Sequence, residues 1–171
     1  MSRLAAFFVL AVLCLGILAD ATFAADEATV KVAYLYNFAK FIQWPDEQRA
    51  TLRLCATGED RLGKALDSLI GKPVRTMQID VRHSISLQDI PQCDLIFVSE
   101  GQVLLLGRVR QAVSGYPILI VAESADTLPR GAMVALIQND NRIVFEVDLT
   151  TARQLGLQVS AKLLQLARKV Y

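Results

Sequence analysis

The segment DLIFVS (Asp94–Ser99) decides the fold, because its four central residues form an unbroken apolar run. A strand with one face in water alternates apolar and polar residues, whereas a strand covered on both faces does not. The segment ILIVA (Ile118–Ala122) repeats this pattern, and the stretch Gln102–Val113 between the two segments has a helical pattern. We therefore predict two buried strands in the middle of a parallel sheet, with a helix between them.

The alternation of strands and helices continues toward both ends of the chain. An aromatic-rich opening helix is predicted over Thr29–Trp44, and Pro45 ends it. The other predicted elements are a strand over Leu52–Thr57, a helix over Asp60–Leu69, a strand over Val74–Val81, hairpin strands over Met133–Gln138 and Arg142–Asp148, a short helix capped by Thr150 or Thr151, and a final helix from Ser160 with Arg168 and Lys169 in its last turn. The pattern predicts one α/β domain, with a mostly parallel central sheet, an antiparallel hairpin extension and helices on both faces.

The amino-terminal residues have the layout of a secretory signal peptide. Arg3 supplies a positive charge, Leu4–Ala19 is almost entirely apolar, and small residues lead to a cleavage site after Ala24. We predict that residues 1–24 are removed and that residues 25–171 form a periplasmic domain that does not span the membrane. An uncleaved membrane anchor is the alternative, although the apolar run is shorter than the roughly 20 residues that a span requires.

The charges of the chain nearly balance, with 18 Lys and Arg against 17 Asp and Glu. Lys and Arg are scattered, and no basic block with interleaved aromatic residues occurs, which argues against a nucleic-acid partner. Two cysteines follow the predicted cleavage site, Cys55 and Cys93. In an oxidising compartment, an isolated pair in a small domain is usually a structural disulfide.

The predicted strands pose a geometric question for this bond. If the strands that start at Leu52 and Asp94 are neighbours in phase, Cys55 and Cys93 lie about 7–10 Å apart along the strand direction. A disulfide needs Cα atoms about 4.4–6.8 Å apart. Either the strands are staggered, or Cys93 lies in the loop before its strand.

Each motif that suggests enzyme chemistry is incomplete. The stretch Gly58–Ala65 has the spacing of a phosphate-binding loop, but Ala65 replaces the hydroxyl that would bind magnesium. His83 is the only histidine, and Asp94 and Asp148 are isolated acids at predicted strand ends. We expect no catalytic site, no metal site and no cofactor; an enzyme based on these three side chains is the weakest alternative.

Four segments, taken in order and spacing, resemble the YfiR family of small periplasmic repressors of a membrane-bound diguanylate cyclase. The segments are AYLYNFAKFIQWP (Ala33–Pro45), LRLCATGEDRLGKAL (Leu52–Leu66), CDLIFVSE (Cys93–Glu100) and RIVFEVDLTTARQLGLQVSAKLLQLARKV (Arg142–Val170). The resemblance covers roughly residues 30–170. It implies an α/β domain, often a homodimer, that holds the periplasmic region of its cyclase in an inactive state and thereby lowers cyclic di-GMP and biofilm formation. It also implies that the two cysteines form the family's principal disulfide.

A repressor without chemistry of its own acts by binding the inactive state of its partner more tightly than the active state. The aromatic opening helix and the carboxyl-terminal helices are the candidate contact surfaces, and Tyr36, Trp44 and Arg168 are the candidate contact residues. A receptor for a small ligand, acting on another membrane signalling protein, is the alternative function, because α/β sheets bind ligands beyond the carboxyl ends of their strands.

Overall fold

The computed structural model describes residues 27–46, 49–57, 62–140 and 142–171. The predicted signal peptide lies outside the described residues, and so does part of the phosphate-loop-like motif. The strands are β1 (Ile42–Gln43), β2 (Thr51–Thr57), β3 (Pro73–Val74), β4 (Met77–Ile85), β5 (Leu95–Val98), β6 (Leu119–Glu123), β7 (Val134–Asn139), β8 (Arg142–Val147), β9 (Gln158–Val159) and β10 (Lys169–Val170).

Apart from the first helix, the helices are short, and three of those described are 3₁₀ helices. They are a helix over residues 27–41, α2 (Gly63–Asp67), η1 (Ile90–Gln92), η2 (Glu100–Leu105), α3 (Leu106–Ala112), η3 (Ala125–Arg130), α4 (Leu149–Gln154) and α5 (Ala161–Leu166). None of the described helices is long and apolar enough to cross a membrane.

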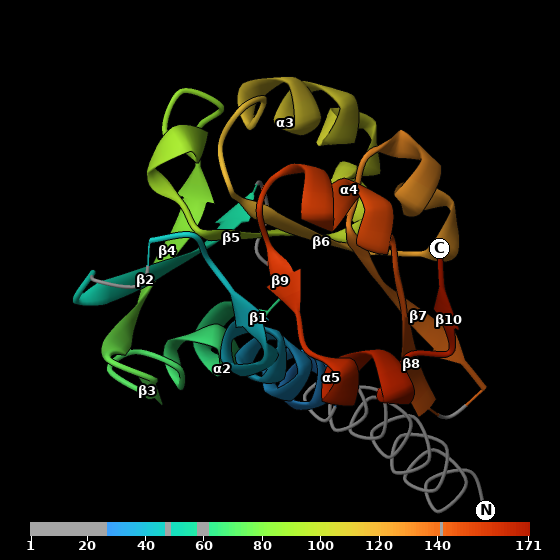
Figure 1. The fold of residues 1–171 in the computed structure, drawn as a ribbon, viewed down its shortest axis with the longest axis horizontal. Helices are drawn as coiled ribbons and strands as arrows, with labels where there is room; N and C mark the ends of the chain where they lie inside the picture. Colours follow the sequence, from blue (N-terminus) through green and yellow to red (C-terminus); the bar gives the residue numbers. More distant parts are fainter. Residues whose placement is uncertain (1–26, 47–48, 58–61, 141) are drawn as a thin grey trace, which may run out of the picture.

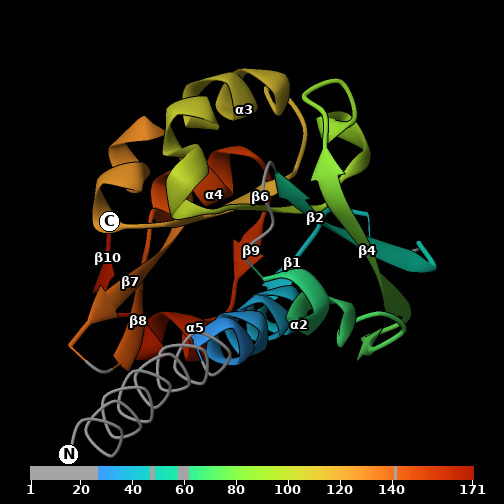
Figure 2. The ribbon, with the colours of Figure 1, turned by 180° about the vertical axis from the view of Figure 1, so that it is seen from behind.

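Within the described residues, eight strands form one sheet in the order β10-β8-β7-β6-β5-β2-β4-β3. The strands β4, β2, β5, β6 and β7 run parallel, while β8 pairs antiparallel with β7 as the predicted hairpin. All residues of β5 and β6 are buried, and two helix layers cover the sheet. The 27–41 helix, α2 and α5 lie on one side, and α3 and α4 lie on the other (Figures 1 and 2). The predicted α/β class and the two buried central strands are confirmed.

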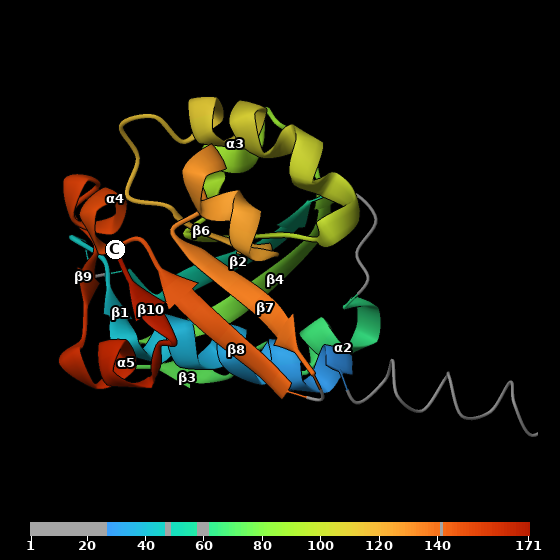
Figure 3. The same cartoon turned by 90° about the vertical axis from the view of Figure 1, so that its right-hand side faces the viewer.

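The opening helix ends earlier than predicted. Instead of continuing to Trp44, the helix stops at residue 41, and Ile42–Gln43 pairs antiparallel with Gln158–Val159. Pro45 disfavours helical geometry at the residue before it, and the pairing with β9 satisfies the backbone there. This small sheet joins the end of the 27–41 helix to the start of α5, so the two helices lie in one layer (Figure 3).

The carboxyl-terminal residues also differ from the prediction. Ser160 caps α5 as expected, since its side chain accepts a hydrogen bond from the Leu163 N–H. The helix ends at Leu166, however, and residues 169–170 form β10 beside β8. Arg168 is therefore outside the last helical turn. The buried carboxylate of Glu146 on β8 accounts for the change, because the extended chain brings Arg168 against it.

Cys55 and Cys93 form a disulfide with Cα atoms 6.1 Å apart. Cys55 lies on β2, where its register partner on β5 is Ile96. Cys93 lies in the loop before β5, at the carboxyl end of η1. The second of the two geometric alternatives is therefore correct. The bond closes a loop with a sequence separation of 38 residues and links β2 to the start of β5.

Replacing Cys55 and Cys93 together by Ala is expected to lower the free energy of unfolding by about 4 kcal/mol, because the unfolded chain regains its loop entropy. Urea denaturation of the purified domain would measure the loss. Reducing the wild-type protein with a thiol is the matched control, since it opens the same loop without removing side-chain volume. A reduced protein as stable as the oxidised protein would contradict the expectation.

Candidate functional site

Tyr36 lies on the exposed flank of the 27–41 helix, and the ammonium groups of two lysines lie over its ring. Its O–H donates to the carbonyl oxygen of Pro73 at 3.1 Å. The Nζ atoms of Lys40 and Lys72 lie 5.3 and 5.4 Å from the centroid of its ring. Cations are attracted to the faces of aromatic rings. The ring therefore gathers positive charge on a surface that the sheet does not cover.

Arg168 belongs to a second surface, at the β10 edge of the sheet. Its Nε and one terminal nitrogen donate to Glu146 Oε1 at 3.0 and 2.8 Å, and the Tyr171 hydroxyl donates to Oε2 at 3.1 Å. Glu146 is 4% exposed, so these donors satisfy a charge that burial would otherwise penalise. Arg168 is thus held in one orientation at the rim of the molecule.

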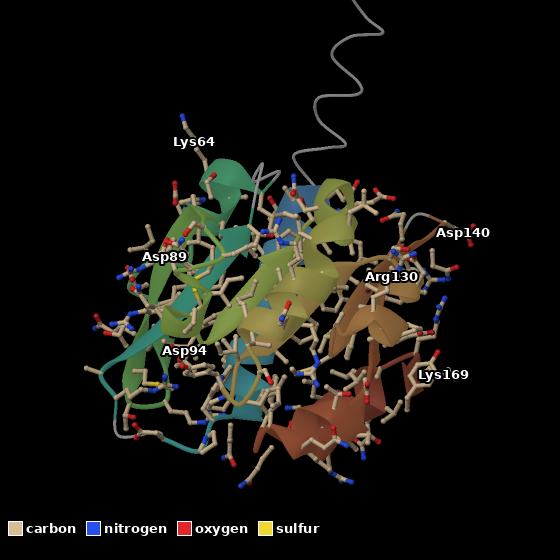
Figure 4. The ribbon with its side chains drawn as sticks, turned by 90° about the horizontal axis from the view of Figure 1, so that it is seen from above. Lys64, Asp89, Asp94, Arg130, Asp140 and Lys169 are labelled. Carbon is tan, nitrogen blue, oxygen red and sulfur yellow. A yellow bond between two sulfur atoms is a disulfide. The ribbon has the colours of Figure 1, made fainter. Side chains whose placement is uncertain are left out.

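Apolar side chains surround this edge. Leu166 is 66% exposed, Tyr171 51% and Val170 40%. Lys169, the other residue of β10, points outward from the same border of the molecule (Figure 4). Because β10 is the terminal strand of the sheet order, its outer side has no neighbouring strand among the described residues. Sheet edges of this kind are common sites of strand addition by a partner.

Trp44 is not at the surface. Its side chain is 3% exposed, and its indole N–H donates to the carbonyl oxygen of Asp94 at 3.1 Å. The expected partner contact at Trp44 is therefore corrected to a core position. Trp44 lies between the two residues of β1 and Pro45, and its ring fills the interior beside the start of β5. Tyr36 and Arg168 remain exposed enough to meet a partner.

A polar hollow that the sequence analysis missed lies at the carboxyl edge of the sheet. Lys31 on the 27–41 helix pairs with Glu27 and with Glu123, the last residue of β6. The second oxygen of Glu123 accepts a hydrogen bond from the Glu100 N–H at 2.6 Å. These side chains line a cavity of about 200 Å³. One feature of the sequence could have predicted this hollow. Glu123 directly follows the buried ILIVA segment, and α/β proteins often place binding groups at the carboxyl ends of such strands.

The pKa of Lys31 reflects its buried partners. Burial by itself lowers the pKa, but hydrogen bonds to Glu123 and Glu27 and their negative charges outweigh that effect. The pKa is therefore raised above the ordinary value of 10.5. Lys31 stays charged at neutral pH and ties the 27–41 helix to the end of β6.

The side chains that suggested an enzyme have structural partners. His83 on β4 is exposed, and its Nε2 lies 2.7 Å from Asp67 Oδ1. Asp94 accepts a hydrogen bond from the Arg53 N–H at 2.7 Å and pairs with Arg49. Asp148 caps α4 by accepting from the Thr151 N–H at 2.9 Å, so the predicted caps Thr150 and Thr151 are wrong.

Metal-ligating side chains do not converge in the part of the chain that the structure describes. No group of three His, Cys, Asp or Glu residues lies there in a geometry that could hold an ion. In the phosphate-loop-like motif, Gly63 and Lys64 begin the five-residue helix α2, while residues 58–61 lie outside the described residues.

Solved structures share this fold at low sequence identity. A conserved domain protein from Vibrio cholerae O1 biovar eltor aligns with a TM-score of 0.56 and 10% identity, over 82% of this chain and 60% of that chain. An ABC domain in complex with L-Trp from Streptococcus pneumoniae aligns with a TM-score of 0.57 and 10% identity, over 84% of this chain and 60% of that chain. The present chain thus spans about 60% of the length of each. At this identity the two likenesses show the fold alone, which is an α/β domain with a mostly parallel sheet.

The particular family follows from the sequence match. The model of the YfiR/HmsC-like family matches residues 28–168, which is most of the chain. The protein belongs to this family, and the predicted resemblance is confirmed. Membership supports a broad role as a periplasmic regulatory protein.

Replacing Glu123 by Gln is expected to lower the free energy of unfolding by about 1–3 kcal/mol at neutral pH, because Lys31 loses its more buried charged partner. The raised pKa of Lys31 means that the pair contributes fully below pH 10.5 and that its contribution is lost as pH rises through the higher folded value. The stability gap between the wild type and Glu123→Gln should therefore be constant from neutral pH to about 10 and narrow above it. Urea denaturation across this pH range would test the sign, with Glu27→Gln as a control that removes the more exposed partner and has the smaller effect. A gap that widens above pH 10.5 would contradict the assignment.

Replacing Trp44 by Phe is expected to cost about 1 kcal/mol of stability, because the Asp94 carbonyl keeps a second donor in the Leu119 N–H. Trp44→Ala should cost about 3–5 kcal/mol through the cavity that it leaves. Thermal unfolding and regulatory activity in cells should be measured on the same variants. The regulatory activity of each variant should be proportional to the amount of folded protein. A stable Trp44→Phe variant without activity would instead indicate that Trp44 contacts the partner.

Proposed function

We propose that the protein binds and inhibits the periplasmic sensor region of an inner-membrane diguanylate cyclase, which lowers cyclic di-GMP and biofilm formation. The observation that carries this proposal is the match to the YfiR/HmsC-like family over residues 28–168. We further propose that residues 1–24 are a cleaved signal peptide, that the mature domain acts in the periplasm, and that it forms a homodimer.

Inhibition by binding requires that the protein prefer the inactive state of the sensor region. Tyr36 and Arg168 are the proposed contacts, because each projects from a surface that neither the sheet nor the opposite helix layer covers. Both side chains are held in place, Tyr36 by Pro73 and Arg168 by Glu146. A pre-positioned side chain loses less conformational entropy when a partner binds it.

Deleting the gene should raise intracellular cyclic di-GMP, and a wild-type copy should restore the original level. Tyr36→Ala should relieve repression because it removes the whole ring, whereas Tyr36→Phe removes only the hydroxyl and should retain most of it. Quantification of cyclic di-GMP in strains with matched protein levels would measure both. An unchanged level in the deletion strain would contradict the function, and full repression by Tyr36→Ala would remove Tyr36 as a contact.

Arg168 needs a compensated variant, since its loss alone would leave Glu146 buried without its cation, at a cost of about 3–5 kcal/mol. The pair Arg168→Gln with Glu146→Gln removes both charges together. This double variant should fold and should relieve repression if Arg168 touches the sensor. Glu146→Gln alone is the control, because it leaves the Arg168 side chain at the surface.

A receptor for small charged molecules is the second candidate function, favoured by the hollow around Lys31 and Glu123 at the carboxyl edge of the sheet. A thermal-shift screen of small organic ions on the purified domain would test it. A shift that disappears in Glu123→Gln would support binding in this hollow. No shift from any compound, at millimolar concentration, would remove this candidate.

A further inference from the structure

The two edges of the eight-stranded sheet differ in how they are protected. At one end, β3 has only two residues, and the first is Pro73, which has no N–H to offer to another strand. The Pro73 carbonyl oxygen accepts a hydrogen bond from the Tyr36 hydroxyl. At the other end, β10 contains no proline, and its outer side has no neighbouring strand among the described residues. The β10 edge is therefore the one that is suited to pairing with a further strand.

Exposed apolar side chains are concentrated at this edge. In the described part of the chain, seven large apolar side chains are exposed, and three of them, Leu166, Val170 and Tyr171, lie in the segment 166–171. Leu166 is the last residue of α5 and lies just before the amino end of β10. It is 66% exposed, so it is free to enter another surface.

A pocket of about 260 Å³ lies at the carboxyl end of β10. It is lined by Tyr171, by Leu128 and Pro129 of η3, and by Asp148 and Thr150 at the start of α4. Leu128 is 7% exposed and contributes to an apolar floor. The pocket has room for one large apolar side chain.

Leu166 and this pocket lie at opposite ends of the same strand. Figures 1 and 3 show α5 at one end of β10 and α4 at the other. At about 3.3 Å per residue, Leu166 and Tyr171 are roughly 15 Å apart along the strand. When two identical strands pair antiparallel about a two-fold axis, the amino end of each lies beside the carboxyl end of the other. Two copies of β10 paired in this way bring Leu166 of each copy to the pocket of the other.

One register of this pairing also keeps the lysines apart. If Lys169 of one copy lies opposite Val170 of the other, each face of the joined sheet carries one lysine and one valine. Directly opposed lysines, which would be destabilising, are avoided. Each Lys169 ammonium can keep its place over its own Tyr171 ring, where it lies 4.2 Å from the centroid.

We propose that the protein dimerises through antiparallel pairing of its β10 edges, with Leu166 of each copy in the pocket beside Tyr171 of the other. This inference rests on the proposed homodimer and supplies its interface. A second copy fits this edge better than an unrelated strand, because the same edge carries both the exposed leucine and the pocket that accepts it. Tyr36 lies beside β3, at the far end of the sheet order, so the dimer leaves the Tyr36 surface free for the cyclase. Arg168, which directly precedes β10, would then meet the sensor region at the border of the dimer.

The mass of the protein in solution tests this interface. The mature protein, purified from the periplasm with its disulfide intact, should be a dimer by analytical ultracentrifugation. Leu166→Gln should raise the dissociation constant of the dimer roughly 100-fold or more, because each dimer loses two buried leucine side chains. The matched control is Leu104→Gln, the same change at an 89% exposed leucine on η2, which should dimerise as the wild type does. Thermal unfolding should show that both variants fold; if Leu166→Gln does not, Leu166→Ala replaces it and should weaken the dimer less.

A second variant fills the pocket instead. Ala125 is exposed and lines the pocket, so Ala125→Trp should block it and should also favour the monomer. Mixing the two variants gives a result that a folding defect cannot give. A mixed dimer places the intact Leu166 of the Ala125→Trp chain in the open pocket of the Leu166→Gln chain, so it keeps one of the two contacts. The mixture should therefore contain more dimer than either variant alone.

A photo-crosslinking amino acid in place of Leu166 identifies what this position touches in cells. Mass spectrometry of the crosslinked peptides should find Leu128, Pro129 or Thr150 of a second copy. Mixing copies labelled with different nitrogen isotopes before crosslinking the purified protein separates contacts between copies from contacts within one copy.

Different results separate the interface from the homodimer itself. A wild-type dimer that Leu166→Gln and Ala125→Trp leave intact overturns the β10 interface, while the proposed homodimer stands. A mixture with no more dimer than its separate components, or crosslinks from position 166 that reach only another protein, also overturns the interface. A wild type that is monomeric up to its solubility limit overturns both. None of these measurements depends on cyclic di-GMP, so their outcome is independent of whether the protein inhibits a cyclase.

Discussion

The structure depends on the burial of β5 and β6 on both faces. Every residue of these two strands is buried, so helices must cover the sheet from both sides. One cover contains α3 and α4, and the other joins the 27–41 helix to α5 from the far end of the sequence. The β1–β9 pairing makes this joint. The exposed side of that composite layer carries Tyr36 with Lys40 and Lys72 beside its ring, so the burial of the core also positions this surface.

Several different interactions fix the position where β5 begins. The disulfide from β2 reaches Cys93 just before β5, and the next residue accepts the Trp44 indole through its carbonyl oxygen. The Asp94 carboxylate binds the Arg53 backbone and Arg49. Core packing, a covalent bond and a buried polar network thus act on the same turn. A change at any of them should be interpreted first as a change in folding and only then as a change in partner binding.

The sequence was informative where local pattern and burial agree. Apolar runs predicted β5, β6 and the β7–β8 hairpin, and the cysteine pair was predicted from the compartment. Tertiary contacts decided the elements that differ. Trp44 lies outside its predicted helix because β9 pairs with the two residues before it. Arg168 and Lys169 lie outside theirs because the extended chain beside β8 brings donors to the buried Glu146 carboxylate. The ion pair of Lys31 with Glu123 joins distant segments, and no periodicity in either segment signals such a contact. The arrangement of lysines around Tyr36 likewise depends on the β3 region meeting the helix flank.

The β1–β9 joint has a consequence for the order in which the protein can fold. A chain made from its amino end produces the 27–41 helix long before β9 exists to hold it. Contacts between such distant segments form late, because a large loop must first close. Until then Leu35, Phe38 and Ile42, which are fully buried in the finished domain, have no complete layer to cover them. The newly made protein therefore has a period in which its aromatic helix is open to chaperones, proteases and other copies, and the arrival of β9 ends that period.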